Sequence, residues 1–172
     1  MRGILKVFMF LIFTAPFAHG CQQTCVAAKQ TAEAECDPHF KNDEIQGFER
    51  QAEEARKLVD QSRREGSTYA TCMASADYLR YSAGASTARA DHCTNKWKAC
   101  YAACSAEATC LRENPAGAAG SADQTKLAQQ NAIQCVTLRQ TRVLQYDQDA
   151  LDKQDFQFRF IDCGKATRNA SL

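Results

Sequence analysis

The sequence predicts an all-α fold, a disulfide-stapled bundle of about four helices made of a long helical hairpin and flanking helices. Three observations carry this prediction. Alanine is abundant, the chain holds only three prolines, and it contains ten cysteines. Alanine has the highest helix propensity but buries little apolar area, so its helices form readily and cohere weakly. Disulfides are expected to offset this thin core, as they do in many exported domains.

The first residues have the pattern of an export signal. Arg2 and Lys6 flank the start of an apolar run, and small residues stand at the −3 and −1 positions of a cut before Cys21. The run is too short to cross a bilayer, which needs ~20 apolar residues. We therefore expect residues 1–20 to be a signal peptide and residues 21–172 to form a single helical, cysteine-rich domain.

A lipid anchor at Cys21 is an alternative to a free N-terminus. Cleavage before Cys21 would leave a cysteine first, as in bacterial lipoproteins, and Gly20 fits such a signal. Ala18 and His19 do not fit it as well. Lipidation would also take one cysteine out of ten and leave an odd number for pairing. Both outcomes place the mature chain outside the cytoplasm, in the periplasm or secreted.

The charge balance argues against some classes of partner. Loss of Arg2 and Lys6 takes the 21 basic residues to 19, against 20 acidic residues. A net charge near −1 gives no electrostatic basis for binding nucleic acid or an anionic membrane. After the signal no apolar run reaches membrane length, so we expect no transmembrane segment in the mature chain. A protein partner is expected, and the sequence does not identify it.

The first helix is expected over residues 22–36, because Pro38 disfavours helical geometry at the residue before it. The second helix is expected to begin after Asn42, a favourable N-cap residue. Two acidic residues follow Asn42, and negative charge stabilises the N-terminal end of a helix. These signals predict a helix, a short connection and a second helix.

The second helix is expected to bend at Gly66 and to continue to Arg80, because apolar residues keep the helical spacing that far. Residues 81–86 then form the predicted turn, centred on Gly84. A third helix over residues 87–111 would return antiparallel to the second. This arrangement is the long hairpin of the predicted fold.

The last part of the chain is expected to be helical from Ser121. Residues 114–120 form the predicted loop, and Ser121 with Gln124 has the form of a capping box. The phenylalanines of residues 156–160 alternate, which is strand spacing, but a single strand would have no partner. We therefore expect a frayed helix or an extended tail there.

The cysteine spacing predicts disulfides between helices. Cys21 and Cys25 are one turn apart, as are Cys100 and Cys104, so two facing helices could form two rungs. The midpoint of Cys72 and Cys93 falls inside the turn predicted at Gly84, which predicts a bridge across the hairpin. The first and third helices are both expected to run antiparallel to the second and therefore parallel to each other, which predicts Cys21–Cys100 and Cys25–Cys104; an antiparallel arrangement would swap these partners. The other pairs are one choice among many connectivities. The expected pairs are Cys72–Cys93, Cys21–Cys100, Cys25–Cys104, Cys36–Cys110 and Cys135–Cys163.

The main function predicted is a non-catalytic binding or structural role, without a cofactor. The chain has no G-x-S-x-G, H-E-x-x-H or C-x-x-C motif and no glycine-rich phosphate loop, so we expect no enzyme. His39 and His92 are far apart in sequence, which disfavours a zinc site, and His92 is expected to be solvated.

Two alternatives to this prediction remain. Inward-facing thiolates of a helical bundle select Cu(I), and Met73 beside Cys72 fits such a site. A carrier of small apolar ligands is the other alternative. The aromatic residues that could line its pocket are Trp97, Tyr101, Tyr78 and Tyr81.

Overall fold

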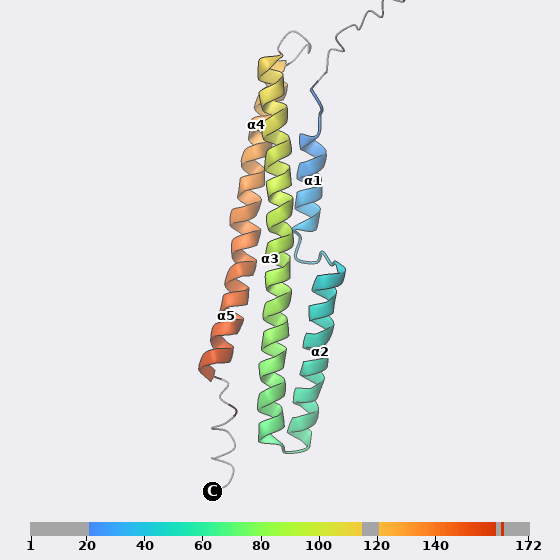
Figure 1. The fold of residues 1–172 in the computed structure, drawn as a ribbon, viewed down its shortest axis with the longest axis vertical. Coiled ribbons are helices and arrows are strands. Elements are labelled where there is room, and N and C mark those ends of the chain that lie inside the picture. The colour runs from blue at the N-terminus through green and yellow to red at the C-terminus, as the bar shows by residue number, and fades with distance from the viewer. Residues whose placement is uncertain (1–20, 115–120, 161–162, 164–172) are drawn as a thin grey trace, which may run out of the picture.

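The computed structural model describes residues 21–114, 121–160 and 163 (Figure 1). Its elements are α1 (Cys25–Glu35), α2 (Asp43–Arg64), α3 (Thr68–Glu113), α4 (Ser121–Leu138), the π-helix η2 (Arg139–Val143) and α5 (Leu144–Phe160). Because α4, η2 and α5 follow without a break, they act as one long helix, and the described ranges contain four helices and no strand. The predicted all-α, disulfide-stapled bundle is confirmed. The predicted signal peptide lies outside the described residues, and the single domain stays a prediction.

Helix α3 is the centre of the molecule. Its 46 residues correspond to a length of about 69 Å at 1.5 Å per residue. Figure 1 shows α1 and α2 one after the other along one side of α3, and α4 and α5 along another. Helix α1 also packs against α4. Every other helix is therefore positioned by its contact with α3.

The connection between α1 and α2 follows the sequence signals. Helix α1 ends at Glu35, ahead of Pro38, and α2 begins after Asn42. The Asn42 Oδ1 atom accepts a hydrogen bond from the backbone N–H of Ile45 at 2.8 Å, which satisfies one of the free donors at the helix start. Both predictions are confirmed. We call residues 36–42 the elbow.

The hairpin turn lies at Gly66 and not at Gly84. Helix α2 ends at Arg64, well before Arg80, and Gly66 has a φ of +72°, a left-handed conformation that favours glycine. Ser67 then caps α3, because its Oγ atom accepts from the backbone N–H of Ala70 at 3.3 Å. The prediction of a turn at residues 81–86 was wrong. Gly66 and Ser67 are an ordinary helix stop and start signal.

Gly84 serves a different purpose, inside α3. A Cβ atom at this position would lie 2.6 Å from Cε1 and 3.2 Å from Cγ of Phe48 on α2. The absence of a side chain therefore lets the Phe48 ring lie directly against the α3 backbone. A glycine in a sequence predicts either a turn or a close approach of two segments. Gly84 allows the close approach of Phe48 to α3.

We expect the substitution Gly84→Ala to destabilise the fold by about 1–3 kcal/mol, because the added methyl group overpacks the Phe48 ring. Gly47→Ala is the matched control, since Gly47 lies in α2 with nothing within 4 Å of its would-be Cβ atom. It should stabilise the chain by up to about 1 kcal/mol through helix propensity. Urea unfolding of both variants measures this. Equal effects of the two substitutions would contradict the close-approach role of Gly84.

The core is thin, as the composition predicts. Apart from Ile45, the largest side chains with less than 2% exposure are all cysteines. They are Cys25, Cys36, Cys93, Cys100, Cys104 and Cys135. Most of the other buried positions are alanines. At its end, α5 stays helical to Phe160, so of the two predictions for residues 156–160 the helix agrees with the structure and the extended tail does not.

Candidate functional site

All ten cysteines are paired in the structure. The bridges are Cys21–Cys110, Cys25–Cys104, Cys36–Cys93, Cys72–Cys163 and Cys100–Cys135. Each bridge has one of its two cysteines on α3. The partners come from the segment before α1, from α1, from the elbow, from α4 and from the segment after α5. Helix α3 is thus covalently joined to every other part of the bundle except α2, which the hairpin turn connects.

One of the five expected pairs, Cys25–Cys104, agrees with the structure. The other four are wrong. They are Cys72–Cys93, Cys21–Cys100, Cys36–Cys110 and Cys135–Cys163. The first fails because Cys72 and Cys93 lie on the same helix, 21 residues or about 31 Å apart along its axis.

The pairs Cys21–Cys100 and Cys36–Cys110 are wrong because α1 runs antiparallel to α3 and not parallel to it, as was expected. Cys21, Cys25 and Cys36 are bonded to Cys110, Cys104 and Cys93, in that order. The residue numbers therefore rise along α1 while those of the partners fall along α3, so the two helices are antiparallel. The elbow bends the chain but does not reverse it, so α1 and α2 follow the same side of α3 (Figure 1). Cys100 is then available to Cys135 of α4.

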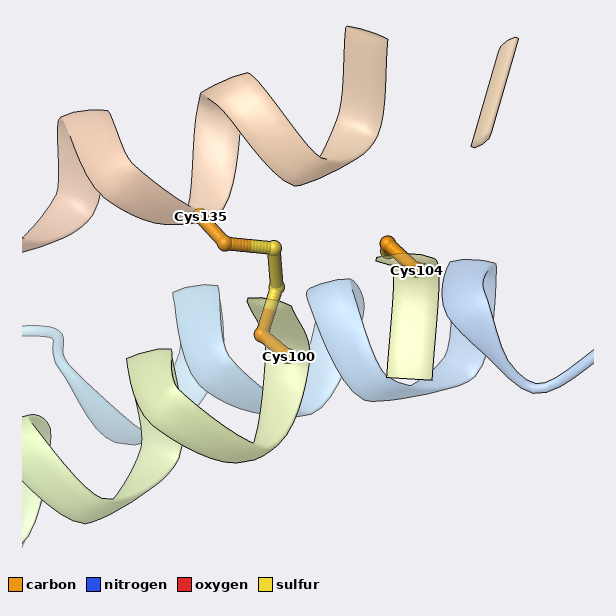
Figure 2. Close-up of side chains that lie close together, drawn as sticks. All are labelled: Cys100, Cys104 and Cys135. Carbon is orange, nitrogen blue, oxygen red and sulfur yellow. A yellow bond between two sulfur atoms is a disulfide. The ribbon is translucent and has the colours of Figure 1, made fainter. Parts of the chain in front are cut away.

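Two of the bridges meet in the interior. The Sγ atoms of Cys100, Cys104 and Cys135 all lie within 4.8 Å of one another. Figure 2 shows the bond from Cys100 to Cys135, with Cys104 beside it. Cys104 is itself bonded to Cys25. We call these four residues the sulfur core. It joins α1, α3 and α4 at one level of the bundle.

The chemistry of the sulfur core depends on its oxidation state. Its cysteines are at most 1% exposed, and Ala32 and Ala132 pack beside them. A cysteine binds a metal ion as a thiolate, whereas each of these sulfur atoms is bonded to another sulfur atom. In this state the sulfur core joins helices. Metal binding would first require reduction of both bridges.

His92 lies in a polar cluster at the elbow. Its Nε2 atom is 2.8 Å from Oε2 of Glu35, and Lys96 Nζ is 2.9 Å from the same oxygen. On the other side, Asn42 Nδ2 faces His92 Nδ1 at 3.4 Å and the Phe40 ring stacks on the imidazole. The expectation of a solvated histidine was wrong, since the side chain is only 22% exposed. This cluster ties α1 and the elbow to α3.

Two further polar clusters tie α3 to its other neighbours. Glu49 of α2 pairs with Arg89 of α3 at 2.5 Å. Asp149 of α5 accepts hydrogen bonds from Ser86 of α3 and, at 2.5 Å, from Lys153. Both clusters lie at contacts between α3 and a flanking helix. Their charged groups are therefore used to hold the bundle together.

The carboxylates of the three clusters have lowered pKa values. A hydrogen bond from Lys96 is the main cause for Glu35. Burial alone would raise the pKa of Glu49 and Asp149. Hydrogen bonds, chiefly from Lys41 to Glu49 and from Lys153 to Asp149, together with the positive charges nearby outweigh the effect of burial and leave both pKa values lowered.

We expect these carboxylates to make the fold sensitive to acid. A carboxyl group with a lowered folded pKa stabilises the fold above its unfolded pKa, and this contribution is lost as the pH falls through the folded pKa. The melting temperature should therefore be highest near neutral pH and decline below about pH 5. The triple variant Glu35→Gln, Glu49→Gln, Asp149→Asn should melt lower at pH 7 and decline less steeply. Thermal melts from pH 7 to pH 3 measure both, and a flat profile for the native chain would contradict the assignment.

A second set of contacts surrounds the Cys36–Cys93 bridge. The Tyr146 hydroxyl of α5 donates a hydrogen bond to the Cys36 carbonyl oxygen at 3.0 Å. Burial raises the pKa of Tyr146. Trp97 packs against the same group of residues, and the Arg139 guanidinium lies 5.4 Å from its ring centre. This group joins α5 to the elbow across α3.

Two of the grooves between the described helices bear on the expected pocket. The larger, about 640 Å³, runs between α3 and α4, and the other, about 520 Å³, lies between α2, α3 and α5. Tyr101 lines the first and Tyr78 the second, whereas Tyr81 contacts Arg80 and lines neither. The four aromatic residues expected to line one pocket are therefore dispersed.

The comparisons with known proteins do not assign the chain to a family. No protein-family profile, no curated protein and no solved structure matches it significantly. None of the helices in the described ranges is both long and apolar enough to span a bilayer. The function must therefore be argued from the geometry of the bundle itself.

Proposed function

We propose that this chain is an exported, non-catalytic protein whose stapled bundle has a binding or structural role outside the cytoplasm. One observation carries the proposal: α3 supplies a cysteine to all five bridges. Such cross-linking fixes a long, alanine-rich helix and its neighbours in one shape. A fixed helical surface suits binding to a partner, because little conformational entropy is lost on association.

The polar clusters support the non-catalytic role. Glu35, Glu49 and Asp149 each take part in a contact that joins α3 to another segment. The His92 side chain is partly enclosed by the elbow and contacts Glu35. These groups hold the helices together, which is the role that a scaffold gives to its polar side chains.

The bridges also support the location. Disulfides form and persist in oxidising compartments such as the periplasm or the extracellular space. We propose that residues 1–20 direct export and are removed before Cys21.

The experiment is expression of the full chain in a host with an oxidising export compartment, followed by N-terminal sequencing and intact mass measurement. We expect Cys21 as the first residue and no sulfhydryl that reacts with an alkylating agent. A chain retained in the cytoplasm with its ten cysteines alkylated would refute the proposal.

The same mass measurement shows whether Cys21 carries a lipid. A diacylglycerol thioether would use the Cys21 sulfur atom, which the structure bonds to Cys110. The two modifications exclude each other on one molecule. A lipid adduct would be accompanied by a free thiol at Cys110, whereas we propose the bridge.

A Cu(I) site is the second candidate, and the gathering of four sulfur atoms in the sulfur core favours it. Cu(I) would need these cysteines as thiolates, so this function and the stapled scaffold use the same atoms in opposite oxidation states. Copper analysis of the purified native chain separates them. If the chain is a scaffold, it should contain neither bound copper nor free thiols. If it holds a copper site, it should contain bound copper and free thiols.

A further inference from the structure

We propose that the groove between α3 and α4 binds an amphiphile with one anionic head group and an unbranched apolar tail, such as a long-chain carboxylate. This inference rests on the proposed binding role and names a ligand class for it. Residues of both helices line the groove, among them Tyr101, Ala108, Arg112, Ala132 and Ile133. Its shape, its charge and its length each bear on the ligand.

The shape of the groove suits an apolar tail. Ala108 of α3 and Ala132 of α4 form its floor, each 8% exposed. Larger side chains line the groove as well, among them Tyr101, which is 45% exposed, and Ile133, which is 66% exposed. A tail lying on the alanine floor would remove this apolar surface from water, which is favourable.

The charge of the groove selects an anionic head. Arg112 is the one charged residue among those that line it. It is exposed and forms no hydrogen bond or ion pair with the described side chains. A guanidinium group can bind a carboxylate through two parallel hydrogen bonds. An anionic head at Arg112 would therefore meet a cation and no competing acid.

The groove between α2, α3 and α5 provides the contrast. It is lined by three acidic and three basic residues, among them the pairs Glu49–Arg89, Glu53–Arg56 and Asp149–Lys153. These charges satisfy one another. It therefore has no unpaired charge with which to select a ligand, although its volume is similar.

The length of the groove determines how long an apolar tail can lie in it. Arg112 and Tyr101 are 11 residues apart on α3, a span of about 16 Å. An extended alkyl chain of roughly 12 carbons has a similar length. The groove volume of about 640 Å³ lies in the range of roughly 300–1,000 Å³ that small-molecule sites occupy.

The test uses the oxidised, full mature chain and three probes with the same tail: dodecanoate, dodecanol and dodecyltrimethylammonium, each below its micelle concentration. Isothermal titration calorimetry should give one dodecanoate per chain. Dodecanoate should bind about tenfold more tightly than dodecanol, as expected for one charge-assisted contact. The cationic probe should bind most weakly. A cationic probe that binds as tightly as dodecanoate would overturn the proposal.

Variants separate the head group from the tail. Arg112→Gln should reduce dodecanoate affinity to that of dodecanol and leave dodecanol unchanged. Ile133→Asp should weaken both probes by at least tenfold. The matched controls are Arg64→Gln and Leu58→Asp on α2, which change an exposed arginine and an exposed leucine away from the groove and should change neither affinity. Circular dichroism of each variant verifies folding.

Failure of this inference is distinct from failure of the proposed function. A native chain that is fully disulfide-bonded but does not bind dodecanoate, or binds it equally after Arg112→Gln and Ile133→Asp, contradicts the ligand and leaves the scaffold intact. A chain with free thiols contradicts the scaffold, whatever it binds.

Discussion

Reduction of the five disulfides is expected to abolish the cooperative thermal transition of this protein near physiological temperature. Each bridge closes a long loop, with sequence separations of 89, 79, 57, 91 and 35 residues. In the chain-entropy model a single loop of this size contributes about 4 kcal/mol. A domain is stable by only about 5–15 kcal/mol. The summed contribution of the five bridges therefore exceeds the free energy of unfolding expected for a domain with an alanine-lined core.

The measurement is a pair of thermal melts by circular dichroism at neutral pH, with and without a phosphine reductant. The oxidised chain should show a sharp transition at high temperature. The reduced chain should retain part of its helical signal, because alanine-rich segments have high helix propensity, but lose the signal gradually. A reduced chain with the same midpoint as the oxidised one would show that packing alone holds the helices.

Removal of the Cys100–Cys135 bridge alone is expected to destabilise the fold more than removal of the less buried Cys72–Cys163 bridge. The Cys100→Ala, Cys135→Ala variant loses about 4 kcal/mol of loop-closure stabilisation. Both side chains are 0% exposed, so their removal also leaves a cavity next to Cys25–Cys104 in the sulfur core. The melting temperature should fall by more than about 10 °C.

The matched control is the Cys72→Ala, Cys163→Ala variant. Its bridge spans 91 residues, and the loop term grows only logarithmically, so it exceeds that of Cys100–Cys135 by less than about 1 kcal/mol. Cys72 and Cys163 are also only partly buried. We therefore expect the control to lose less than the variant in the sulfur core. The reverse order would show that loop length, and not the buried packing of sulfur, decides the effect.

Local signals in the sequence predict the fold class and several boundaries. The Asn42 cap and the end of α1 ahead of Pro38 are decided by nearby residues, and both are confirmed. The end of α3 at Glu113 agrees with the loop expected to begin at residue 114. Signals of this kind depend on hydrogen bonding within a few residues, so they do not require knowledge of the tertiary structure.

The hairpin turn could not be placed from such signals alone. Gly66 and Gly84 are both glycines within helical spacing. One adopts a left-handed φ and the other admits the Phe48 ring. The distinction depends on a contact between α2 and α3, which no local pattern contains. A shift of the turn by 18 residues then made α3 nearly twice as long as expected.

The disulfide errors followed from the misplaced turn and from the direction of α1. With the turn at Gly66, Cys72 lies at the start of α3 and cannot reach Cys93. The one-turn spacing of Cys21 with Cys25 and of Cys100 with Cys104 correctly indicated that these helices face each other. It gave no direction, and only Cys25–Cys104 was paired correctly. The groove of the proposed ligand was also not predicted, because its walls come from two helices distant in sequence.

The connectivity itself is the most direct test of the stapled α3. Tryptic digestion of the unreduced chain separates Cys36, Cys72, Cys93 and Cys163 into different peptides, residues 30–41, 65–80, 90–96 and 160–165. Mass spectrometry should find peptide 30–41 linked to 90–96 and peptide 65–80 linked to 160–165, as Cys36–Cys93 and Cys72–Cys163 require. A link between 65–80 and 90–96, or any of these four peptides with a free thiol, would contradict the account.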